Sequence, residues 1–239
     1  MEKKSVSLSD LLCNKCKVRF LGICSSLNHN ELNLISNLTK HLYIKKGREL
    51  ISLNDKADKI YNVVKGSIRQ YKILPDGRRQ IVGFLFPGDF LGIPFEEIFS
   101  YYADTIEDSC LCVFDRKDFE SFLVKCPSFK MEVLKKISLK LSKSFEHSVI
   151  LGKKDAKEKL ASFIILLSKA QGMLNKNNHY KIPMTREDIS DYLGLRTETT
   201  SRIFTAFKED GLISFIDKQN NSFSINNINE LEKLSKIED

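Results

Sequence analysis

Residues 184–202 read MTREDISDYLGLRTETTSR, and this stretch decides the fold that we expect. Thr185 followed three residues later by Asp188 is a variant of the capping box, which marks the start of a helix. That helix should end at Gly194, and a second helix should follow with Thr197 as its cap. Two short helices joined by a turn that contains glycine are typical of a helix-turn-helix.

The segment after these helices predicts a small hairpin. The second helix should end close to Gly211, and residues 212–216 and 223–225 then indicate two strands. A turn through residues 218–221 joins them. The two helices and the hairpin together predict a winged helix-turn-helix.

The second helix carries side chains suited to recognising DNA bases. In a helix-turn-helix, the amino-terminal half of this helix enters the major groove. Glu198, Ser201 and Arg202 lie on one face, and Thr197 stands at the helix start. Arginine can bond guanine, glutamate can accept from cytosine, and serine can bond several base edges. Glu198 and Arg202 also match an ordinary i,i+4 ion pair, but beside a turn and a wing we favour base recognition.

The part of the chain upstream predicts β-structure. Short apolar or alternating segments are separated by turns that contain glycine or proline. Many short strands at near-regular spacing suggest a sandwich or a jelly-roll barrel. The expected strands are residues 49–53, 60–64, 67–74, 80–86 and 110–114.

A long helix is expected between the strands and the helix-turn-helix. Residues 128–151 contain neither glycine nor proline, and Gly152 should interrupt the helix. A narrow apolar stripe flanked by lysines is typical of a coiled-coil seam, so we predict a dimer interface. The stripe residues are Leu134, Ile137, Leu141 and Phe145.

The composition excludes several classes of protein. Of 239 residues, 42% are hydrophobic and 29% charged, which excludes a disordered polyelectrolyte. The longest apolar run, residues 163–167, is too short to span a bilayer, so no membrane partner is expected. Residues 1–12 lack the apolar core of a secretory signal, so we expect the protein in the cytoplasm. The net charge of +7 is spread over the chain and permits DNA binding without demonstrating it.

Three of the six cysteines crowd the start of the chain. Cys13, Cys16 and Cys24 follow the spacing C-x2-C-x7-C. Thiolate is the form that binds metals, and nearby cations should lower the pKa of these thiols. The cations between them are Lys15, Lys17 and Arg19. An iron–sulfur cluster would need a fourth thiolate. The candidates are Cys110, Cys112 and Cys126.

The spacing alone leaves the chemistry of these thiols open. The strand period puts Cys110 and Cys112 on one face, so it does not choose between them. A zinc ion held by four thiolates uses the same ligand set as a cluster. A thiol oxidoreductase built on Cys13 and Cys16 is disfavoured, because the strand-then-helix setting of such a motif is missing.

Residues 184–202 resemble the DNA-binding signature of the CRP/FNR transcription regulators. The order of parts is similar over almost the whole chain, which implies an α+β protein with four parts. These are a cysteine loop (1–30), a jelly-roll-like β-roll of the cyclic-nucleotide-binding type (31–127), a dimerisation helix (128–151) and a winged helix-turn-helix (152–239). Glu198, Ser201 and Arg202 match the FNR-type recognition face. Thr200 departs from the family, which usually has an apolar β-branched residue there.

The resemblance also implies a cofactor. FNR proteins hold an oxygen-labile 4Fe–4S cluster with three amino-terminal cysteines and one from the β-roll. Residues 105–116 are similar to that central region and put Cys112 at the ligand position. The implied ligands are therefore Cys13, Cys16, Cys24 and Cys112. The x7 spacing resembles the FnrN/FixK-like branch, and Cys126 is expected to be a buried, inert thiol.

By this resemblance, the protein is a regulator and not an enzyme. The cluster-loaded homodimer would bind a palindrome like TTGAT-N4-ATCAA at low oxygen and contact RNA polymerase through an exposed turn at residues 76–79. A cyclic nucleotide is not expected, because residues 88–115 contain acidic side chains and no lysine or arginine to bind a phosphate. The alternative is a regulator of the same fold with zinc or no metal at the cysteines and no response to oxygen.

Overall fold

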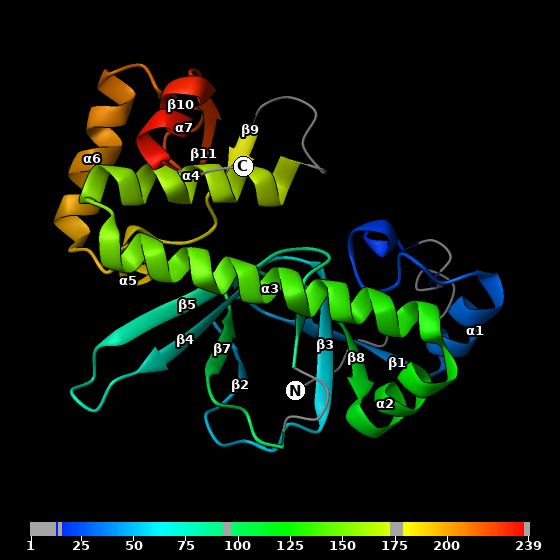
Figure 1. Ribbon diagram of the computed structural model, residues 1–239. Coiled ribbons are helices and arrows are strands. Elements are labelled where there is room, and N and C mark those ends of the chain that lie inside the picture. Colours follow the sequence, from blue (N-terminus) through cyan, green and yellow to red (C-terminus); the bar gives the residue numbers. More distant parts are fainter. Residues whose placement is uncertain (1–12, 14–15, 93–96, 173–178, 237–239) are drawn as a thin grey trace. The chain divides into compact units, whose positions relative to one another are not determined.

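The computed structural model describes residue 13 and residues 16–92, 97–172 and 179–236. The chain forms two compact units, whose elements are labelled in Figure 1. The first contains the described residues up to Gln70 together with Phe84–Leu141. The second contains Tyr71–Gly83 together with the described residues from Ser142 onward.

The first unit is built on two sheets that form a β-roll. One sheet has the strand order β1-β8-β3-β6, with antiparallel pairing. The other has the order β2-β7-β4-β5, and the outer parts of β4 and β5 belong to the second unit. The strands are β1 (Thr39–Ile44), β2 (Glu49–Ile51), β3 (Lys59–Lys65), β4 (Ile68–Ile73), β5 (Arg79–Leu85), β6 (Phe90–Leu91), β7 (Tyr102–Thr105) and β8 (Ser109–Asp115).

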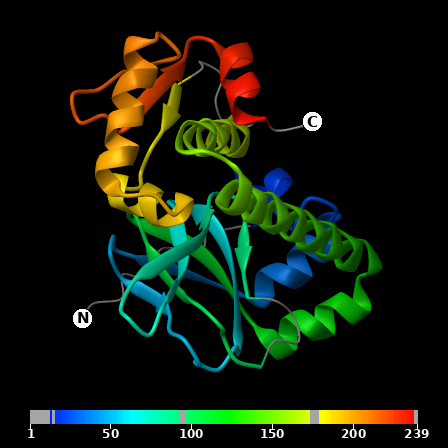
Figure 2. The same cartoon turned by 60° about the vertical axis from the view of Figure 1, so that its left-hand side comes forward.

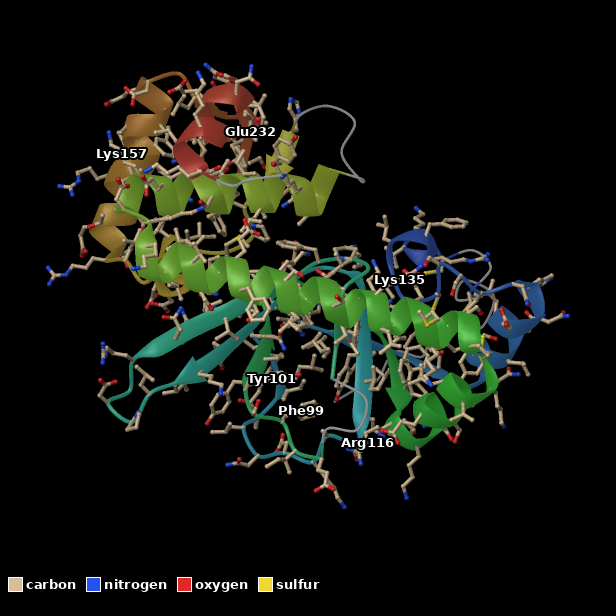
Figure 3. The ribbon with its side chains drawn as sticks, viewed as in Figure 1. Phe99, Tyr101, Arg116, Lys135, Lys157 and Glu232 are labelled. Carbon is tan, nitrogen blue, oxygen red and sulfur yellow. The ribbon has the colours of Figure 1, made fainter. Side chains whose placement is uncertain are left out.

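The interior of the β-roll is an apolar cluster. Val63, Leu91 and Leu111 are fully buried in it. The rings of Phe99 and Tyr101 join the same cluster, with their centroids 5.7 Å apart (Figure 3). Burying apolar side chains of this size stabilises the fold by about 1.5–3 kcal/mol each.

A second cluster lies between the β1-β8-β3-β6 sheet and three helices, α1 (His29–Asn37), α2 (Arg116–Lys125) and the start of α3 (Pro127–Lys153). The Phe129 ring meets the rings of Phe119 and Phe122 edge to face, at 5.4 and 5.1 Å between centroids. Ile23 and Leu27 follow the short 3₁₀ helix η3 (Arg19–Leu21), and both are buried in this cluster. The cysteine-containing segment is therefore anchored by its own apolar residues.

All five predicted strands are confirmed, as β2, β3, β4, β5 and β8. The sequence patterns did not predict β1, β6, β7, α1 or α2. Strand β1 lacks a clear alternation, since its burial pattern is irregular. Strand β6 has only two residues, and β7 contains the polar residues Asp104 and Thr105. Their pairing partners, rather than their own periodicity, specify these strands.

The long helix is confirmed, but its expected end is wrong. Helix α3 runs through Gly152 to Lys153 without interruption. One glycine inside a helix costs about 1 kcal/mol relative to alanine, which a helix of 27 residues tolerates. Helix α4 (Ala156–Gly172) follows, with Asp155 accepting hydrogen bonds from the backbone N–H groups of Lys157 and Glu158. Among the described residues, no helix combines the length and apolar character needed to cross a membrane.

The second unit contains the winged helix-turn-helix. Helix α5 (Arg186–Leu193) begins with the predicted capping box of Thr185 and Asp188, and ends at Gly194 in the left-handed conformation. Helix α6 (Thr197–Glu209) follows, and the two meet at this short turn (Figure 2). The remaining elements are β9 (His179–Lys181), β10 (Ile213–Phe215), β11 (Ser222–Ile225) and α7 (Ile228–Ser235).

Two details of this motif differ from the sequence prediction. Thr197 is not the cap of α6: the capping position is Arg196, whose side chain makes no capping hydrogen bond. The wing has three strands in the order β10-β11-β9, because His179–Lys181 pairs with the far side of β11. Residues 173–178, between α4 and β9, lie outside the described residues.

Candidate functional site

The buried side of α6 is fixed by α5. Thr200, Ile203, Phe204 and Phe207 are buried, so this face of α6 packs inward. The hydroxyl groups of Thr200 and Ser190 are hydrogen-bonded at 2.8 Å. Thr200, the departure from the family pattern, therefore has a partner for its buried polar group and leaves no unpaired hydroxyl.

A cation adds to this packing. The guanidinium carbon of Arg186 lies 3.7 Å from the ring centroid of Phe204 and 5.5 Å from that of Phe215. Burial lowers the pKa of Arg186 to about 10, so the side chain remains charged at neutral pH. Cation–π contacts of this kind stabilise packing, and here they join α5, α6 and the wing.

The opposite face of α6 presents the residues predicted to recognise bases. Glu198 and Arg202 are exposed, while Thr197 and Ser201 are half-buried beside them. In the part of the chain that the structure describes, Glu198 and Arg202 form no ion pair with each other. The i,i+4 ion pair that the sequence also allowed is therefore not formed, and both charged groups are available to a ligand.

The turn between β4 and β5 is exposed only in part. Asp76 and Arg78 are exposed and form an ion pair with each other at 2.8 Å. Arg79 was expected to belong to the same exposed turn, but its side chain is only 22% exposed. It pairs instead with Asp188 and Asp191 of α5. Of the four residues expected at the exposed turn, only residues 76–78 are therefore exposed.

Three of the four residues of the predicted dimer stripe are solvent-exposed in the single chain. Leu134, Leu141 and Phe145 are 48%, 53% and 64% exposed. Ile137 differs, because it is half-buried and packs against the core cluster of α1, α2 and α3. An exposed row of large apolar side chains on one helix marks an interaction surface.

The four cysteines implied as ligands line one small cavity. Cys13, Cys16 and Cys24 meet Cys112 of β8 there, together with Arg19 and Asn62. The cavity has a volume of about 20 Å³, which is room for about one water molecule. The donor set suits a group bound by four thiolates, and the cavity would have to enlarge to admit a group bigger than a water molecule.

The thiols are not arranged around a single point. Among the described residues, no three cysteine, histidine, aspartate or glutamate side chains converge closely enough to hold one metal ion. A tetrahedral zinc ion with Zn–S bonds of about 2.3 Å would need its four sulfurs about 3.8 Å apart. The cysteines thus share a cavity without forming a single-ion site.

Burial outweighs nearby positive charge at these thiols. Burial raises the pKa of Cys24 to about 12, and the neighbouring Cys13 and Cys16 add to the increase. Burial also raises the pKa values of Cys13 and Cys112, again with neighbouring cysteines contributing. The expectation that cations lower these pKa values is wrong for Cys13 and Cys24, where Arg19 only partly opposes the increase. Lys15 lies outside the described residues.

The remaining two cysteines have different surroundings. Cys110 is buried on the same strand as Cys112, hydrogen-bonded to Tyr43, and does not line the cavity. Cys126 is buried, and its thiol donates to Oε1 of Glu31 at 3.0 Å. These positions are consistent with non-ligand roles, and the ligand set itself stays a prediction.

Two contacts at this site had no signal in the sequence. Nε2 of His41 lies 3.5 Å from Sγ of Cys112, because β1 and β8 pair these two residues directly. Nζ of Lys136 in α3 donates to the main-chain oxygen of Leu21 at 2.6 Å. The cysteine segment is therefore tied to the same helix that carries the apolar stripe. Strand β1 was not predicted, so His41 could not be placed beside Cys112.

Comparison with protein families gives two matches along the chain. Residues 41–126 match the cyclic nucleotide-binding domain, and residues 158–234 match the Crp-like helix-turn-helix domain. The first match corresponds to the β-roll with α2, and the second to the unit that carries α5, α6 and the wing.

Several characterised proteins are similar over most of their length. The nitrogen fixation regulation protein FixK of Bradyrhizobium diazoefficiens is 37% identical over 205 residues, covering 85% of this chain and 86% of that protein. The transcriptional activator protein FnrL of Cereibacter sphaeroides is 32% identical, covering 87% and 86%. The solved structure of FixK2 from Bradyrhizobium japonicum aligns with a TM-score of 0.78 and 28% identity, covering 84% of this chain and 99% of that one.

Proposed function

Because the chain belongs to the CRP/FNR family of DNA-binding transcription regulators, we propose that it is an FNR-type regulator that senses oxygen through a 4Fe–4S cluster. The observation that carries this proposal is the meeting of four cysteines, three from the amino-terminal segment and one from β8, at one cavity. An anaerobic regulatory protein of Haemophilus influenzae, 32% identical over 231 residues, is among the relatives. The anaerobic role of that relative supports a response to oxygen.

Cys13, Cys16, Cys24 and Cys112 would hold the cluster. When bound, the cluster supplies a group that reacts with oxygen. The four thiols must lose their protons to bind it, so loading releases protons and is opposed at low pH. Arg19 lines the same cavity and its guanidinium donates to the main-chain oxygen of Leu27 at 2.6 Å. Its fixed positive charge would offset part of the negative charge of four thiolates.

We place DNA recognition on Thr197, Glu198, Ser201 and Arg202 of α6. A homodimer presents two such helices to successive major grooves, which requires a palindromic site. TTGAT-N4-ATCAA is the sequence that the FNR-type face implies. RNA polymerase would contact the exposed turn at residues 76–78, and a regulator of this kind acts in the cytoplasm.

We place the dimer interface on the exposed stripe of α3. The hydrogen bond between Lys136 and Leu21 links this helix to the cysteine segment. A group bound at the cysteines that moves the segment would therefore act on α3 directly. This contact supports a switch in which cluster loading favours the dimer and cluster loss favours monomers.

A cyclic nucleotide is not part of the proposal, despite the family name of the domain. The guanidinium of Arg69 in β4 pairs with both carboxylate oxygens of Asp104 in β7, at 2.6 and 2.9 Å. Residues 88–115 contribute no lysine or arginine. A phosphodiester in this region would meet an arginine that is already paired, together with unfavourable negative charge.

Anaerobic purification with iron and sulfide analysis tests the cluster. We expect brown protein with about four iron atoms per chain. Single cysteine-to-serine variants identify the ligands: Cys112→Ser should lose iron and visible absorbance, whereas the matched controls Cys110→Ser and Cys126→Ser should keep both. A Cys110→Ser variant without cluster, beside a loaded Cys112→Ser, would reverse the fourth-ligand assignment.

The alternative function is regulation with zinc or no metal at the cysteines. The small volume of the cavity that the four cysteines line, about 20 Å³, favours the metal-free form of this alternative. Colourless protein from anaerobic cells, with zinc or no metal and the same DNA affinity with and without oxygen, would establish this alternative and reject the oxygen sensor.

A further inference from the structure

Two neighbouring arginines in the β4–β5 hairpin have different surroundings. Arg78 is exposed and, among the described residues, forms an ion pair only with Asp76 in its own turn. The guanidinium of Arg79 instead bridges two carboxylates of α5. Its Nε donates to Oδ2 of Asp191 at 2.7 Å, and its terminal N–H group donates to Oδ1 of Asp188 at 2.8 Å. All of these residues belong to the second compact unit.

The next residue along β5 binds the backbone of the same helix. Nε2 of Gln80 donates to the main-chain oxygen of Asp191 at 2.6 Å and lies 3.3 Å from that of Tyr192. These carbonyls lie in the last turn of α5, and the carbonyl groups of a helix's last turn have no N–H partner within the helix. Nε2 of His147 in α3 donates to the same Tyr192 oxygen at 2.8 Å. Side chains from β5 and α3 therefore converge on one end of α5.

The carboxylate of Asp188 has the guanidinium of Arg79 as a charge partner. The Asp188 side chain is 1% exposed. Its other oxygen, Oδ2, accepts the capping hydrogen bond from the backbone N–H of Thr185 at 3.1 Å. Removing one partner of a buried ion pair leaves an uncompensated charge, which is strongly unfavourable. The start of α5 is thus sensitive to Arg79.

We infer that Arg79 and Gln80 are positioning residues for DNA recognition. They hold α5 by its side chains and by its last carbonyls, and α5 holds α6 through the buried hydrogen bond between Ser190 and Thr200. Strands β4 and β5 continue into the sheet of the first unit, so the backbone that carries these two residues is shared by both units. The inference rests on the DNA binding of the family and does not require the cluster.

The adjacent arginines supply a matched pair of variants, Arg79→Gln and Arg78→Gln. Each full-length protein is titrated at fixed salt with a palindromic TTGAT-N4-ATCAA duplex and with a scrambled duplex of equal length. Arg79→Gln should weaken binding to the palindrome about 10-fold or more and binding to the scrambled duplex less than about 3-fold, because misplaced recognition helices lose base contacts but keep phosphate contacts. Arg78→Gln should change either affinity less than about 2-fold.

Two further variants separate positioning from a general loss of structure. Arg79→Lys keeps the charge but cannot bridge two carboxylates as a fork, so its affinity should lie between those of the wild type and Arg79→Gln. Asp191→Asn should weaken palindrome binding. The double variant Arg79→Gln/Asp191→Asn should bind about as well as Arg79→Gln alone, because Arg79→Gln already removes the contact with Asp191 that Asp191→Asn weakens. Circular dichroism and sedimentation at the assay temperature check fold and oligomeric state.

Several outcomes would overturn the inference. These are wild-type affinity in Arg79→Gln, equal weakening on both duplexes, or strictly additive effects of Arg79→Gln and Asp191→Asn. If Arg79→Gln does not fold, the same comparison with Arg79→Lys and Gln80→Met decides the matter. Failure of the wild type to prefer the palindrome would instead contradict the proposed binding site, and the variants are then compared on a duplex selected from random sequence.

Discussion

The hydroxyl groups of Ser190 in α5 and Thr200 in α6 lie 2.8 Å apart, and both side chains are buried. Ser190 also donates to the main-chain oxygen of Arg186 at 2.7 Å, within its own helix. Removing one hydroxyl therefore affects the hydrogen bonding of the other to a different extent. Ser190 keeps a partner without Thr200, whereas Thr200 depends on Ser190 among the contacts that the structure shows.

This asymmetry predicts unequal effects on stability. Ser190→Ala should lower the free energy of unfolding by about 1–3 kcal/mol, because it leaves a buried hydroxyl without its partner. Thr200→Val should cost less than about 1 kcal/mol, because it keeps the β-branched shape and leaves Ser190 bonded to Arg186. Urea unfolding of both variants measures the difference. A larger loss in Thr200→Val than in Ser190→Ala would show that this assignment of partners is wrong.

The exposed face of α6 predicts which residues read DNA sequence. Arg202→Ala and Glu198→Ala should each cost about 1–3 kcal/mol per half-site on the palindrome and relax the preference at one base pair. Lys208→Ala and Glu209→Ala, at the far end of the same helix, are controls of matching charge. Titration with single-base variants of the duplex at fixed salt measures the preference. Uniform weakening on every duplex would assign Arg202 and Glu198 to phosphate contacts instead.

The predictions that succeeded came from local signals. The capping box of Thr185, the glycine at 194 and the short apolar runs of β3 and β8 depend on neighbouring residues, so the sequence displays them directly. The contacts that hold the site together join residues far apart in sequence. Arg79 is indistinguishable from Arg78 in the sequence, and only the tertiary fold turns one toward α5 and leaves the other in solvent.

The thiol environment shows the same limit of sequence analysis. The spacing of Cys13, Cys16 and Cys24 suggested a metal site, and the basic residues beside them suggested lowered pKa values. Burial depends on Ile23 and Leu27 packing into the cluster of α1, α2 and α3, which spacing does not reveal. Desolvation therefore has the larger effect, and the pKa values of Cys13 and Cys24 rise.

A pH dependence follows from His147 in α3. Its ring stacks on that of Tyr192 at 4.0 Å between centroids. Burial lowers its pKa, and Lys159 adds a smaller effect in the same direction. Since the folded pKa lies below the unfolded value of about 6.5, the stability that the neutral ring contributes is present above pH 6.5 and is lost as the pH falls through the folded pKa.

We therefore expect the wild type to lose stability more steeply than His147→Gln between about pH 6.5 and pH 5. Half-buried His41, whose pKa is also lowered by burial, is present in both proteins and cancels in the comparison. Urea unfolding at a series of pH values gives both slopes. Parallel slopes would mean that His147 keeps its ordinary pKa in the folded protein.

The exposed stripe of α3 predicts the dimer interface and provides its own control. Leu141 and Leu139 are 53% and 56% exposed on the same helix, but only Leu141 lies in the row with Leu134 and Phe145. Leu141→Glu should abolish dimers and DNA binding even in the cluster-loaded protein, because it places charges against each other in an apolar seam. Leu139→Glu makes the same chemical change outside the row and should leave both properties close to those of the wild type.

Anaerobic sedimentation of the loaded and metal-free proteins at micromolar concentration measures both effects. The wild type should be mostly dimeric when loaded and mostly monomeric without the cluster, a shift that needs a differential contribution of about 5 kcal/mol at most. Ile137→Glu is a poorer probe, since Ile137 also packs against the core and its loss would unfold part of the first unit. A stable metal-free dimer, or a Leu139→Glu variant as monomeric as Leu141→Glu, would contradict the monomer–dimer switch. The cluster would then have to act on the orientation of the two α6 helices within a permanent dimer.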